Sequence, residues 1–257
     1  MDLDAFVNVF KNRAQASGFV LDFDGTLSQI ASKPSGVAPV AGSVDVLEAL
    51  AAGYAVVALL SGRRAESLAG IVGAKAVRYV GVYGAEEYRE GKLIQPPEAD
   101  RWRGMASRLA RDAEALVLSE GLRGTEIEYK DLAVSIHYRN TERQDAAQIV
   151  RGWAENVAPK RGFDYGVGRK VVELRPRGVS KAGAFEKIVG ETRVEGITTA
   201  GDDYTDVEVL ARARELMGTA ALRIGMTSDE EPAGLRDEAD LLCSSPGELV
   251  ELLRKFL

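Results

Sequence analysis

The sequence contains few of the residues that cross-link chains or bind transition metals. Its 257 residues include one cysteine, Cys243, and one histidine, His137. A single cysteine excludes an intrachain disulfide, and a lone histidine is not a metal site. No apolar run approaches the length of a membrane-spanning helix, and the acidic start of the chain, residues 1–4, lacks the pattern of a signal peptide. We therefore expect a soluble cytoplasmic protein without a membrane anchor.

The chain also has fewer positively charged than negatively charged residues. The chain has 33 lysines and arginines against 39 aspartates and glutamates, a net charge of −6 at pH 7, and no long basic run. Binding of nucleic acid needs a basic surface, so nucleic acid is not an expected partner. Hydrophobic residues make up 46% of the chain, which supports a full core. The length suits one large domain or two modest ones, and we expect a monomer.

Strand and helix patterns alternate in the first and last parts of the chain. Apolar runs near residues 19–23 and 55–60 each precede a helical pattern, near 43–52 and 65–72. The same alternation resumes after Lys181 and continues to the C-terminus. This order of elements predicts a parallel sheet with helices on both faces.

The middle of the chain has a different pattern. Two stretches alternate polar and apolar residues at period two around a tight turn, and two further stretches form hairpin patterns around Gly91 and Gly168. Two helical patterns accompany them, near 98–118 and 141–156. An antiparallel sheet with two helices is the expected structure, inserted into the parallel-sheet domain.

We therefore predict two domains. Residues 1–82 and 176–257 form the catalytic core, and residues 83–175 form the inserted α+β cap. The cap is expected to cover the site and to select the substrate, because two different patterns in one chain indicate two separately packed units.

Two acidic residues follow directly after the first apolar run. Residues 21–27 read Leu-Asp-Phe-Asp-Gly-Thr-Leu, so that Asp22 and Asp24 lie two residues apart at the end of a predicted buried strand. Active sites of open α/β sheets lie at such strand ends. Two carboxylates on the same side of a strand repel each other, and a bound cation is the expected reason for keeping them.

A second acidic cluster follows another β-like run, at Asp202, Asp203 and Asp206. Between the clusters lie Ser61, after an apolar run, and Lys181, before a helical stretch. Each of these features has a plainer reading: a turn at Ser61, a solvated lysine, or a helix N-cap at Asp202 or Asp203. Taken together, these residues predict a site for Mg²⁺ and phosphate. The acidic side chains supply the hard oxygen ligands that Mg²⁺ prefers, and the hydroxyl and ammonium groups suit a phosphate dianion.

The four motifs, in this order, resemble those of the haloacid-dehalogenase-like phosphotransferase superfamily. They are residues 22–26, residues 61–63, Lys181 and residues 201–206. The resemblance implies a Rossmann-like core with an inserted cap and a phosphomonoesterase that uses an aspartyl-phosphate intermediate and Mg²⁺. The implied roles are nucleophile for Asp22, general acid and base for Asp24, phosphate binding for Thr26, Ser61, Gly62 and Lys181, and metal binding for Asp22, Asp24 (through its backbone carbonyl), Asp202 and Asp206, with Asp203 in support.

Residues of the insert narrow the resemblance. Alternation places Glu128 and Lys130 on one strand face, Ser135, His137 and Arg139 on another, and Glu173 on a third. Paired acidic and basic side chains suit polyol recognition, since each hydroxyl both donates and accepts. The alternative is a solvated sheet face with surface ion pairs.

The insert and the core motifs together are similar to those of trehalose-6-phosphate phosphatases. The similarity rests on residues 128–130, 137–139, 173–178 and 201–206 and implies that Lys130, Arg139, Glu173 and Glu128 contact the sugar. Three motifs depart from the family pattern: residues 81–84 read Gly-Val-Tyr-Gly in place of Gly-Asn-His-Gly, Ala182 stands in place of a glycine, and Val207 in place of a glutamate. None of the three departures replaces an aspartate of the predicted reaction.

Four other functions remain open at this stage. Phosphatases for mannosyl-3-phosphoglycerate or sucrose 6-phosphate would share all the core residues, and a sugar phosphomutase would keep both Asp22 and Asp24. A non-catalytic sugar-phosphate sensor would need neither a nucleophile nor an acid, so the intact aspartates argue against it. Phosphate release from an aryl phosphate in the presence of Mg²⁺ would separate an enzyme from a sensor.

Overall fold

The computed structural model describes residues 2–30 and 36–257. The chain divides into two compact units. Unit 1 contains Met1–Ile94 and Ser180–Leu257, and unit 2 contains Gln95–Val179. Unit 2 corresponds to the insert that the sequence predicts at residues 83–175.

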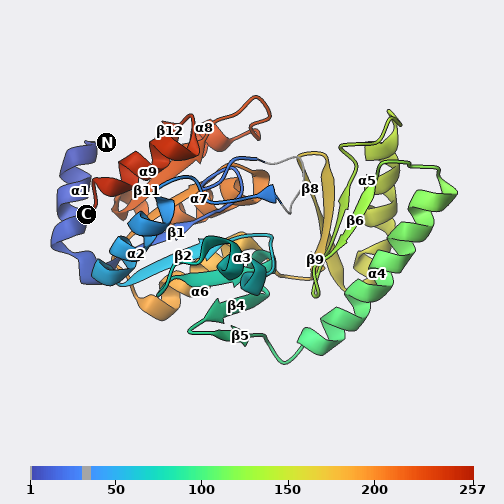
Figure 1. Ribbon diagram of the computed structural model, residues 1–257, viewed down its shortest axis with the longest axis horizontal. Helices are drawn as coiled ribbons and strands as arrows, with labels where there is room; N and C mark the ends of the chain where they lie inside the picture. The colour runs from blue at the N-terminus through green and yellow to red at the C-terminus, as the bar shows by residue number, and fades with distance from the viewer. Residues whose placement is uncertain (1, 31–35) are drawn as a thin grey trace. The chain divides into compact units, whose positions relative to one another are not determined.

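Unit 1 is built on an eight-stranded sheet (Figure 1). The strand order is β12-β11-β10-β1-β2-β3-β4-β5; the first six of these pair in parallel, and the last two are antiparallel additions. The strands are β1 (Ser17–Leu21), β2 (Val56–Leu60), β3 (Arg78–Gly81), β4 (Glu86–Arg89), β5 (Lys92–Ile94), β10 (Gly196–Gly201), β11 (Ala221–Met226) and β12 (Leu241–Cys243).

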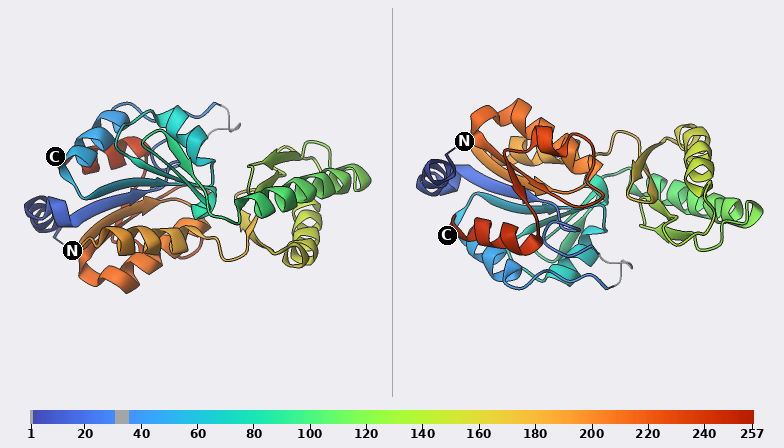
Figure 2. Two further views of the ribbon diagram at one scale, coloured as in Figure 1. Left: turned by 90° about the horizontal axis from the view of Figure 1, so that it is seen from below. Right: turned by 90° about the horizontal axis from the view of Figure 1, so that it is seen from above.

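The sheet has helices on both faces because its central strands are apolar on both sides. Phe19 and Leu21 of β1 belong to one core cluster, whereas Val20 between them belongs to the cluster on the opposite face. Figure 2 shows the gold and orange helices on one side of the sheet and the blue and red helices on the other. The helices are α1 (Leu3–Asn12), α2 (Ser43–Gly53), α3 (Ala65–Val72), α6 (Lys181–Thr192), α7 (Tyr204–Met217), α8 (Leu235–Glu238) and α9 (Pro246–Arg254), with short 3₁₀ turns η1 (Ala14–Ala16), η3 (Val82–Gly84) and η5 (Gly218–Ala220).

The first helix, α1, was not predicted from the sequence. Asp2 caps it by accepting a hydrogen bond from the amide of Ala5, at 3.2 Å. Phe10 is 3% exposed, and its ring lies edge-on to that of Phe19, with centroids 5.7 Å apart. The helix therefore depends on apolar contacts with β1 more than on its own short sequence, as expected for a helix of this length.

The hairpin of β4 and β5 belongs to the large sheet. Gly81 of β3 pairs with Glu86 of β4 in antiparallel register. The sequence patterns had grouped this hairpin with the insert, because hairpin and period-two signals look alike wherever they occur. Its pairing with β3 moves the start of unit 2 to Gln95.

Unit 2 is a four-stranded antiparallel sheet in the order β6-β7-β9-β8, with two long helices on one of its faces (Figure 1). Val134, Ile136, Val172 and Leu174 point from the sheet into the core shared with those helices. The opposite face therefore presents the alternate residues of each strand. The elements are β6 (Glu126–Tyr129), β7 (Val134–His137), β8 (Phe163–Gly168), β9 (Val171–Pro176), α4 (Ala99–Ser119), α5 (Ala146–Val157) and the turn η4 (Pro159–Arg161).

A large, mostly parallel sheet with a separate antiparallel unit confirms the fold class expected from the sequence. Among the described residues, no helix is both long and apolar enough to cross a membrane.

Candidate active site

The candidate site lies at the carboxyl ends of the central strands. Strand β1 is flanked by β10 and β2, and Leu21 pairs with Ala200 on one side and Leu59 on the other. Parallel strands in register place the residues that follow them side by side. Asp22 and Asp202 therefore meet, and Ser61 follows on the neighbouring strand. The strand order runs away from β1 in both directions across the sheet. In such folds a ligand site usually lies at the point where the strand order reverses.

The two acidic motifs are in direct contact. Gly25 has a φ of +79°, and a Cβ added to it would lie 2.2 Å from Oδ2 of Asp202. Any side chain at position 25 would collide with that carboxylate and strain the backbone. The glycine that follows Asp24 is therefore explained by the approach of the second motif, a contact between residues far apart in the sequence.

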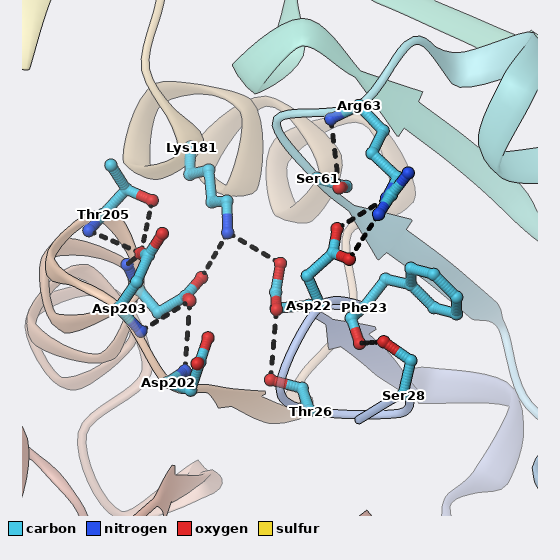
Figure 3. A network of polar contacts seen from close by, with 12 residues as sticks. Asp22, Phe23, Thr26, Ser28, Ser61, Arg63, Lys181, Asp202, Asp203 and Thr205 are labelled. Carbon is cyan, nitrogen blue, oxygen red and sulfur yellow. Dashed lines mark hydrogen bonds and ion pairs between the residues drawn. The ribbon is translucent and has the colours of Figure 1, made fainter. Parts of the chain in front are cut away.

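Lys181 joins the motifs through buried ion pairs (Figure 3). Its ammonium group donates to Oδ1 of Asp22 at 2.7 Å and to Oδ1 of Asp206 at 2.8 Å. Thr26 donates its hydroxyl to the other oxygen of Asp22, at 3.1 Å. Ser180 caps α6 by accepting from the amide of Gly183, so the helix begins where Lys181 reaches Asp22. The carboxylate of Asp22 is thus fixed by two donors.

The start of α7 organises the second acidic motif. Asp203 caps the helix, with Oδ1 accepting from the amides of Thr205 and Asp206 at 2.8 and 3.0 Å. Oδ2 of Asp206 accepts from the amides of Asp202 and Asp203, each at 3.1 Å. The N-cap reading of this motif therefore holds for Asp203. Both oxygens of Asp206 are engaged, one by these amides and one by Lys181.

Burial and crowding of like charges shape the titration of the site. Burial raises the pKa of Asp22 to about 7, with Lys181 opposing the rise and the neighbouring carboxylates adding to it. Burial alone would raise the pKa of Asp203, but the charge of Lys181 and hydrogen bonds within the α7 cap lower it to about 2. Burial opposes the charge on Lys181, yet the surrounding carboxylates raise its pKa well above the ordinary value, so it stays protonated.

Three buried carboxylates form a group that could hold a metal ion. Ligand oxygens of Asp22, Asp202 and Asp206 lie within 4.8 Å of one another, and the three residues are 5%, 6% and 3% exposed. Ionised, the three carboxylates bring like charges close together beside the ammonium group of Lys181, which is 2% exposed. Like charges held this close in a buried site repel one another, and a divalent cation with oxygen ligands would relieve that repulsion. The donor set therefore fits a hard cation.

The side chain of Asp24 lies in a different contact. Arg63 forms a two-pronged ion pair with it: Nε donates to Oδ2 and Nη2 to Oδ1, both at 2.7 Å. The guanidinium carbon lies 6.0 Å from the centroid of the Phe23 ring, and the amide of Arg63 donates to Oγ of Ser61 at 3.1 Å. The charged pair links the first two motifs. No role was assigned to Arg63 from the sequence, where its position directly after Ser61 and Gly62 was the available signal.

Tyr83 lies against the loop that contains Ser61. Val82 and Tyr83 have φ values of +48° and +58°, uncommon for residues with side chains and costly for a β-branched one. The amide of Tyr83 donates to the carbonyl of Ser61 at 3.0 Å, and the amide of Val82 to that of Arg63 at 2.7 Å. A Cβ added to Gly62 would lie 2.6 Å from the hydroxyl oxygen of Tyr83. The residue that departs from the family pattern thus supports the predicted phosphate loop.

Gly62→Ala tests this packing. The added methyl group would overlap the Tyr83 ring, so we expect a loss of about 1–3 kcal/mol of stability and a fall in kcat of at least about tenfold. Thermal unfolding and steady-state kinetics measure both. Gly70→Ala, in α3 with no atom within 4 Å of the added Cβ, is the control and should be slightly stabilising. Unchanged activity of Gly62→Ala would show that the loop geometry does not matter.

In unit 2, the predicted sugar-binding residues of the sheet lie on the face without helices. Nζ of Lys130 is 3.6 Å from Oε2 of Glu128 and 3.5 Å from Oε1 of Glu173. Ser135 donates to Oε1 of Glu173 at 3.3 Å, and Nε2 of His137 lies 2.9 Å from Oε2 of Glu128. Lys130 is only 7% exposed, which distinguishes it from an ordinary solvated lysine.

Arg139 lies just beyond the end of β7. Its Nη2 donates to the carbonyl oxygen of Arg169, in the turn between β8 and β9, at 3.2 Å. The structure thus brings Glu128, Lys130 and Glu173 into one ion-pair network, and connects Arg139 to a hairpin of the same sheet. The roles of all four residues in binding sugar stay predictions.

Comparison with known proteins adds sequence relatives and a structural neighbour. The family described as trehalose-phosphatase matches residues 20–233. A trehalose-phosphate phosphatase of Mycobacterium marinum is 34% identical over 164 residues, which are 60% of this chain and 39% of that protein. One of Mycobacterium avium is 32% identical over 207 residues, 75% of this chain and 50% of that protein. The chain therefore spans half or less of the length of these relatives.

Among solved structures, the C-terminal domain of a C. albicans trehalose-6-phosphate phosphatase aligns with a TM-score of 0.81. The alignment covers 100% of this chain and 96% of that one, at 18% sequence identity. At this identity the likeness supports the fold.

Proposed function

Because this chain belongs to the trehalose-phosphatase family, we propose that it hydrolyses trehalose 6-phosphate to trehalose and phosphate. The observation that carries the proposal is the buried carboxylate of Asp22, held between Lys181 and Thr26 beside the second acidic motif. A carboxylate fixed in this way, next to a group that could hold a cation, is suited to attack an electrophile such as phosphorus.

We propose Mg²⁺ as the cofactor. Asp22 and Asp202 would hold it through their carboxylates, and Asp24 through its backbone carbonyl. Asp206 would complete this group of carboxylates, and its oxygens also accept hydrogen bonds from Lys181 and from the amides that precede α7. When bound, the ion offsets the charge repulsion between the site and a phosphate dianion.

The reaction proceeds in two displacements. In the first, an oxygen of Asp22 forms a bond to phosphorus, the bond from phosphorus to the sugar oxygen breaks, and Asp24 donates a proton to the leaving oxygen. In the second, Asp24 accepts a proton from water, which attacks phosphorus and releases Asp22 and phosphate. Thr26, Ser61 and Lys181 would hold the phosphate oxygens through both steps.

The pairing of Asp24 with Arg63 adds a requirement to this scheme. Both oxygens of Asp24 are engaged by the guanidinium group. To donate a proton to a leaving sugar oxygen, the side chain must release at least one of these bonds. A phosphate ester is itself a strong acceptor for guanidinium, so its arrival would favour that release.

Unit 2 would supply the sugar specificity. Lys130, Glu128 and Glu173 offer donors and acceptors on one sheet face, and sugar hydroxyls need both. Arg139 would add a further donor. Binding energy from a part of the substrate that does not react helps to position the phosphate for attack.

A phosphate-release screen tests the proposed function. The wild-type protein with Mg²⁺ is assayed on trehalose 6-phosphate, glucose 6-phosphate, sucrose 6-phosphate and p-nitrophenyl phosphate. We expect the highest kcat/KM on trehalose 6-phosphate. A preference for sucrose 6-phosphate would reassign the substrate, and phosphate transfer between sugar positions with a bisphosphate would indicate a mutase. No release from any of them would indicate a sensor.

Glu173→Ala tests the role of the sheet face. Loss of two charged hydrogen bonds to sugar, each worth about 1.5–3 kcal/mol, should lower kcat/KM for trehalose 6-phosphate by about 10²-fold or more. Hydrolysis of p-nitrophenyl phosphate should change little, because this substrate has no second sugar. Steady-state kinetics on the two substrates make the comparison.

Glu126→Ala is the matched control. Glu126 lies on the same strand and face as Glu128 and is exposed. It should leave both substrates unaffected. If Glu173→Ala lowered the hydrolysis of both substrates equally, Glu173 would be supporting the fold; if it changed neither, this face of the sheet would be merely solvated.

A further inference from the structure

One turn of unit 1 adopts a backbone conformation that residues with side chains rarely take. Three consecutive residues of η3, Val82, Tyr83 and Gly84, have φ values of +48°, +58° and +105°. Left-handed conformations are sterically unfavourable for a residue with a Cβ, above all for a β-branched one such as Val82. Such strain persists only where the surrounding contacts impose it, and it is common at functional sites. The contacts of this turn therefore indicate its role.

On one side, the turn holds the predicted phosphate loop around Gly62. The amide of Val82 donates to the carbonyl oxygen of Arg63 at 2.7 Å. The amide of Tyr83 donates to the carbonyl oxygen of Ser61 at 3.0 Å. The ring of Tyr83, which is 3% exposed, lies against Gly62, where an added Cβ would be 2.6 Å from the hydroxyl oxygen of the tyrosine. The backbone on both sides of Gly62 is thus held by the turn.

On the other side, the turn packs against the start of α6, which carries Lys181. A Cβ added to Gly84 would lie 2.5 Å from Cβ of Ala184 and 3.6 Å from the carbonyl oxygen of Ser180. The same carbonyl oxygen accepts a hydrogen bond from the amide of Ala184 at 3.0 Å. The backbone of the turn therefore contacts the first turn of the helix from which Lys181 reaches Asp22.

Both sides of the turn carry residues predicted to bind phosphate, Ser61 and Gly62 on one side and Lys181 on the other. We propose that the η3 turn is a positioning element for phosphate. Tyr83 fixes the loop and Gly84 fixes the helix, so the turn sets the spacing between them. Misplacement by about 1 Å in such a site can cost about 10²-fold in rate. The inference rests on the proposed function and adds to it two positioning residues that act through their neighbours.

Tyr83→Leu tests the contact with the loop. Loss of the ring should let the loop shift, and we expect the Kd of inorganic phosphate, measured by titration calorimetry with Mg²⁺ present, to rise at least about tenfold. Values of kcat/KM on trehalose 6-phosphate and on p-nitrophenyl phosphate should fall by the same factor, because the phosphate is common to both substrates. Tyr83→Phe keeps the ring beside Gly62 and should bind phosphate within about threefold of the wild type.

Tyr79→Leu is the matched control. Tyr79 lies on β3 just before the turn and is 4% exposed, and its hydroxyl donates to the carbonyl oxygen of Ala74 at 2.6 Å. Loss of this ring should lower the melting temperature about as much as loss of the Tyr83 ring, since both are buried. The Kd of phosphate should stay within about twofold of the wild type. A Tyr83→Leu protein that loses stability but binds phosphate like the wild type would overturn the inference.

Ala184→Val tests the other side of the turn without changing Tyr83. The added methyl groups would press on Gly84, so we expect the Kd of phosphate to rise about tenfold. Gly190→Ala, in α6 with no atom within 4 Å of the added Cβ, is the control and should change nothing. If the turn joins the two sides, Tyr83→Leu combined with Ala184→Val should bind phosphate about as weakly as the weaker single variant. Losses that multiply would show two independent contacts and would overturn the coupling.

The phosphate titration separates this inference from the proposed function. A wild-type protein that binds phosphate but hydrolyses only the aryl phosphate would contradict the proposed substrate, and the Kd values of the variants would still decide the role of the turn. A wild-type protein that binds no phosphate in the presence of Mg²⁺ would overturn both.

Discussion

Asp22→Asn is expected to abolish phosphate release from every substrate, a loss of at least about 10³-fold in kcat. An amide is a poor nucleophile, and the proposed reaction has no other group to form the bond to phosphorus. Lys181 keeps its contact with Asp206 in the variant, so the fold should survive. Removing one of three crowded carboxylates should also weaken Mg²⁺ binding.

Phosphate release, circular dichroism and titration calorimetry with Mg²⁺ measure these effects. Mass spectrometry must show that the asparagine has not deamidated to aspartate, which would restore activity. Asp45→Asn, an exposed residue in the first turn of α2, is the matched control and should behave as the wild type. Substantial turnover by intact Asp22→Asn protein would sink the covalent mechanism.

Removal of divalent metal is expected to have an effect of similar size. After exhaustive treatment with EDTA, the protein should release no measurable phosphate, and Mg²⁺ should restore the activity. The reason is the crowding of buried carboxylates around Asp22, whose repulsion an incoming phosphate dianion would increase. Ca²⁺ should inhibit, because its larger and looser coordination shell disturbs in-line attack.

The pH dependence of Mg²⁺ binding gives an independent readout. Burial raises the pKa of Asp22 to about 7 in the metal-free protein, so at pH 6 the carboxyl group is mostly protonated and Mg²⁺ must displace the proton. Apparent affinity should therefore fall as the pH drops below 7, by at most about tenfold per pH unit for one proton, and should level off above pH 8. Full activity after EDTA treatment, or an affinity that rises toward low pH, would contradict this account of the site.

The sequence was most informative where a local pattern suffices. Asp22 and Asp202 each follow a short apolar run, and strands of a parallel sheet end at a common edge, so their proximity followed from the patterns. The period of two in the insert likewise assigned Glu128, Lys130 and Glu173 to polar strand faces, and the structure brings these three into contact. Side-chain direction in a strand depends only on position along the chain, so it can be read from the sequence.

Contacts between distant residues were beyond such reasoning. Helix α1 is held by Phe10 packing on Phe19, and the hairpin of β4 and β5 belongs to the large sheet through its pairing with β3. The pairing of Arg63 with Asp24 likewise depends on how β1 and β2 lie side by side.

The sequence by itself determined the parallel core, the antiparallel insert and the order of the four motifs, because periodicity and turn residues act over a few positions. Only the tertiary structure decided that Asp203 caps α7 while Asp206 holds Lys181, and that Gly25 is required by Asp202. The physical reason is that hydrogen-bond partners and free space are set by atoms from distant segments, and these are defined only once the sheets have assembled.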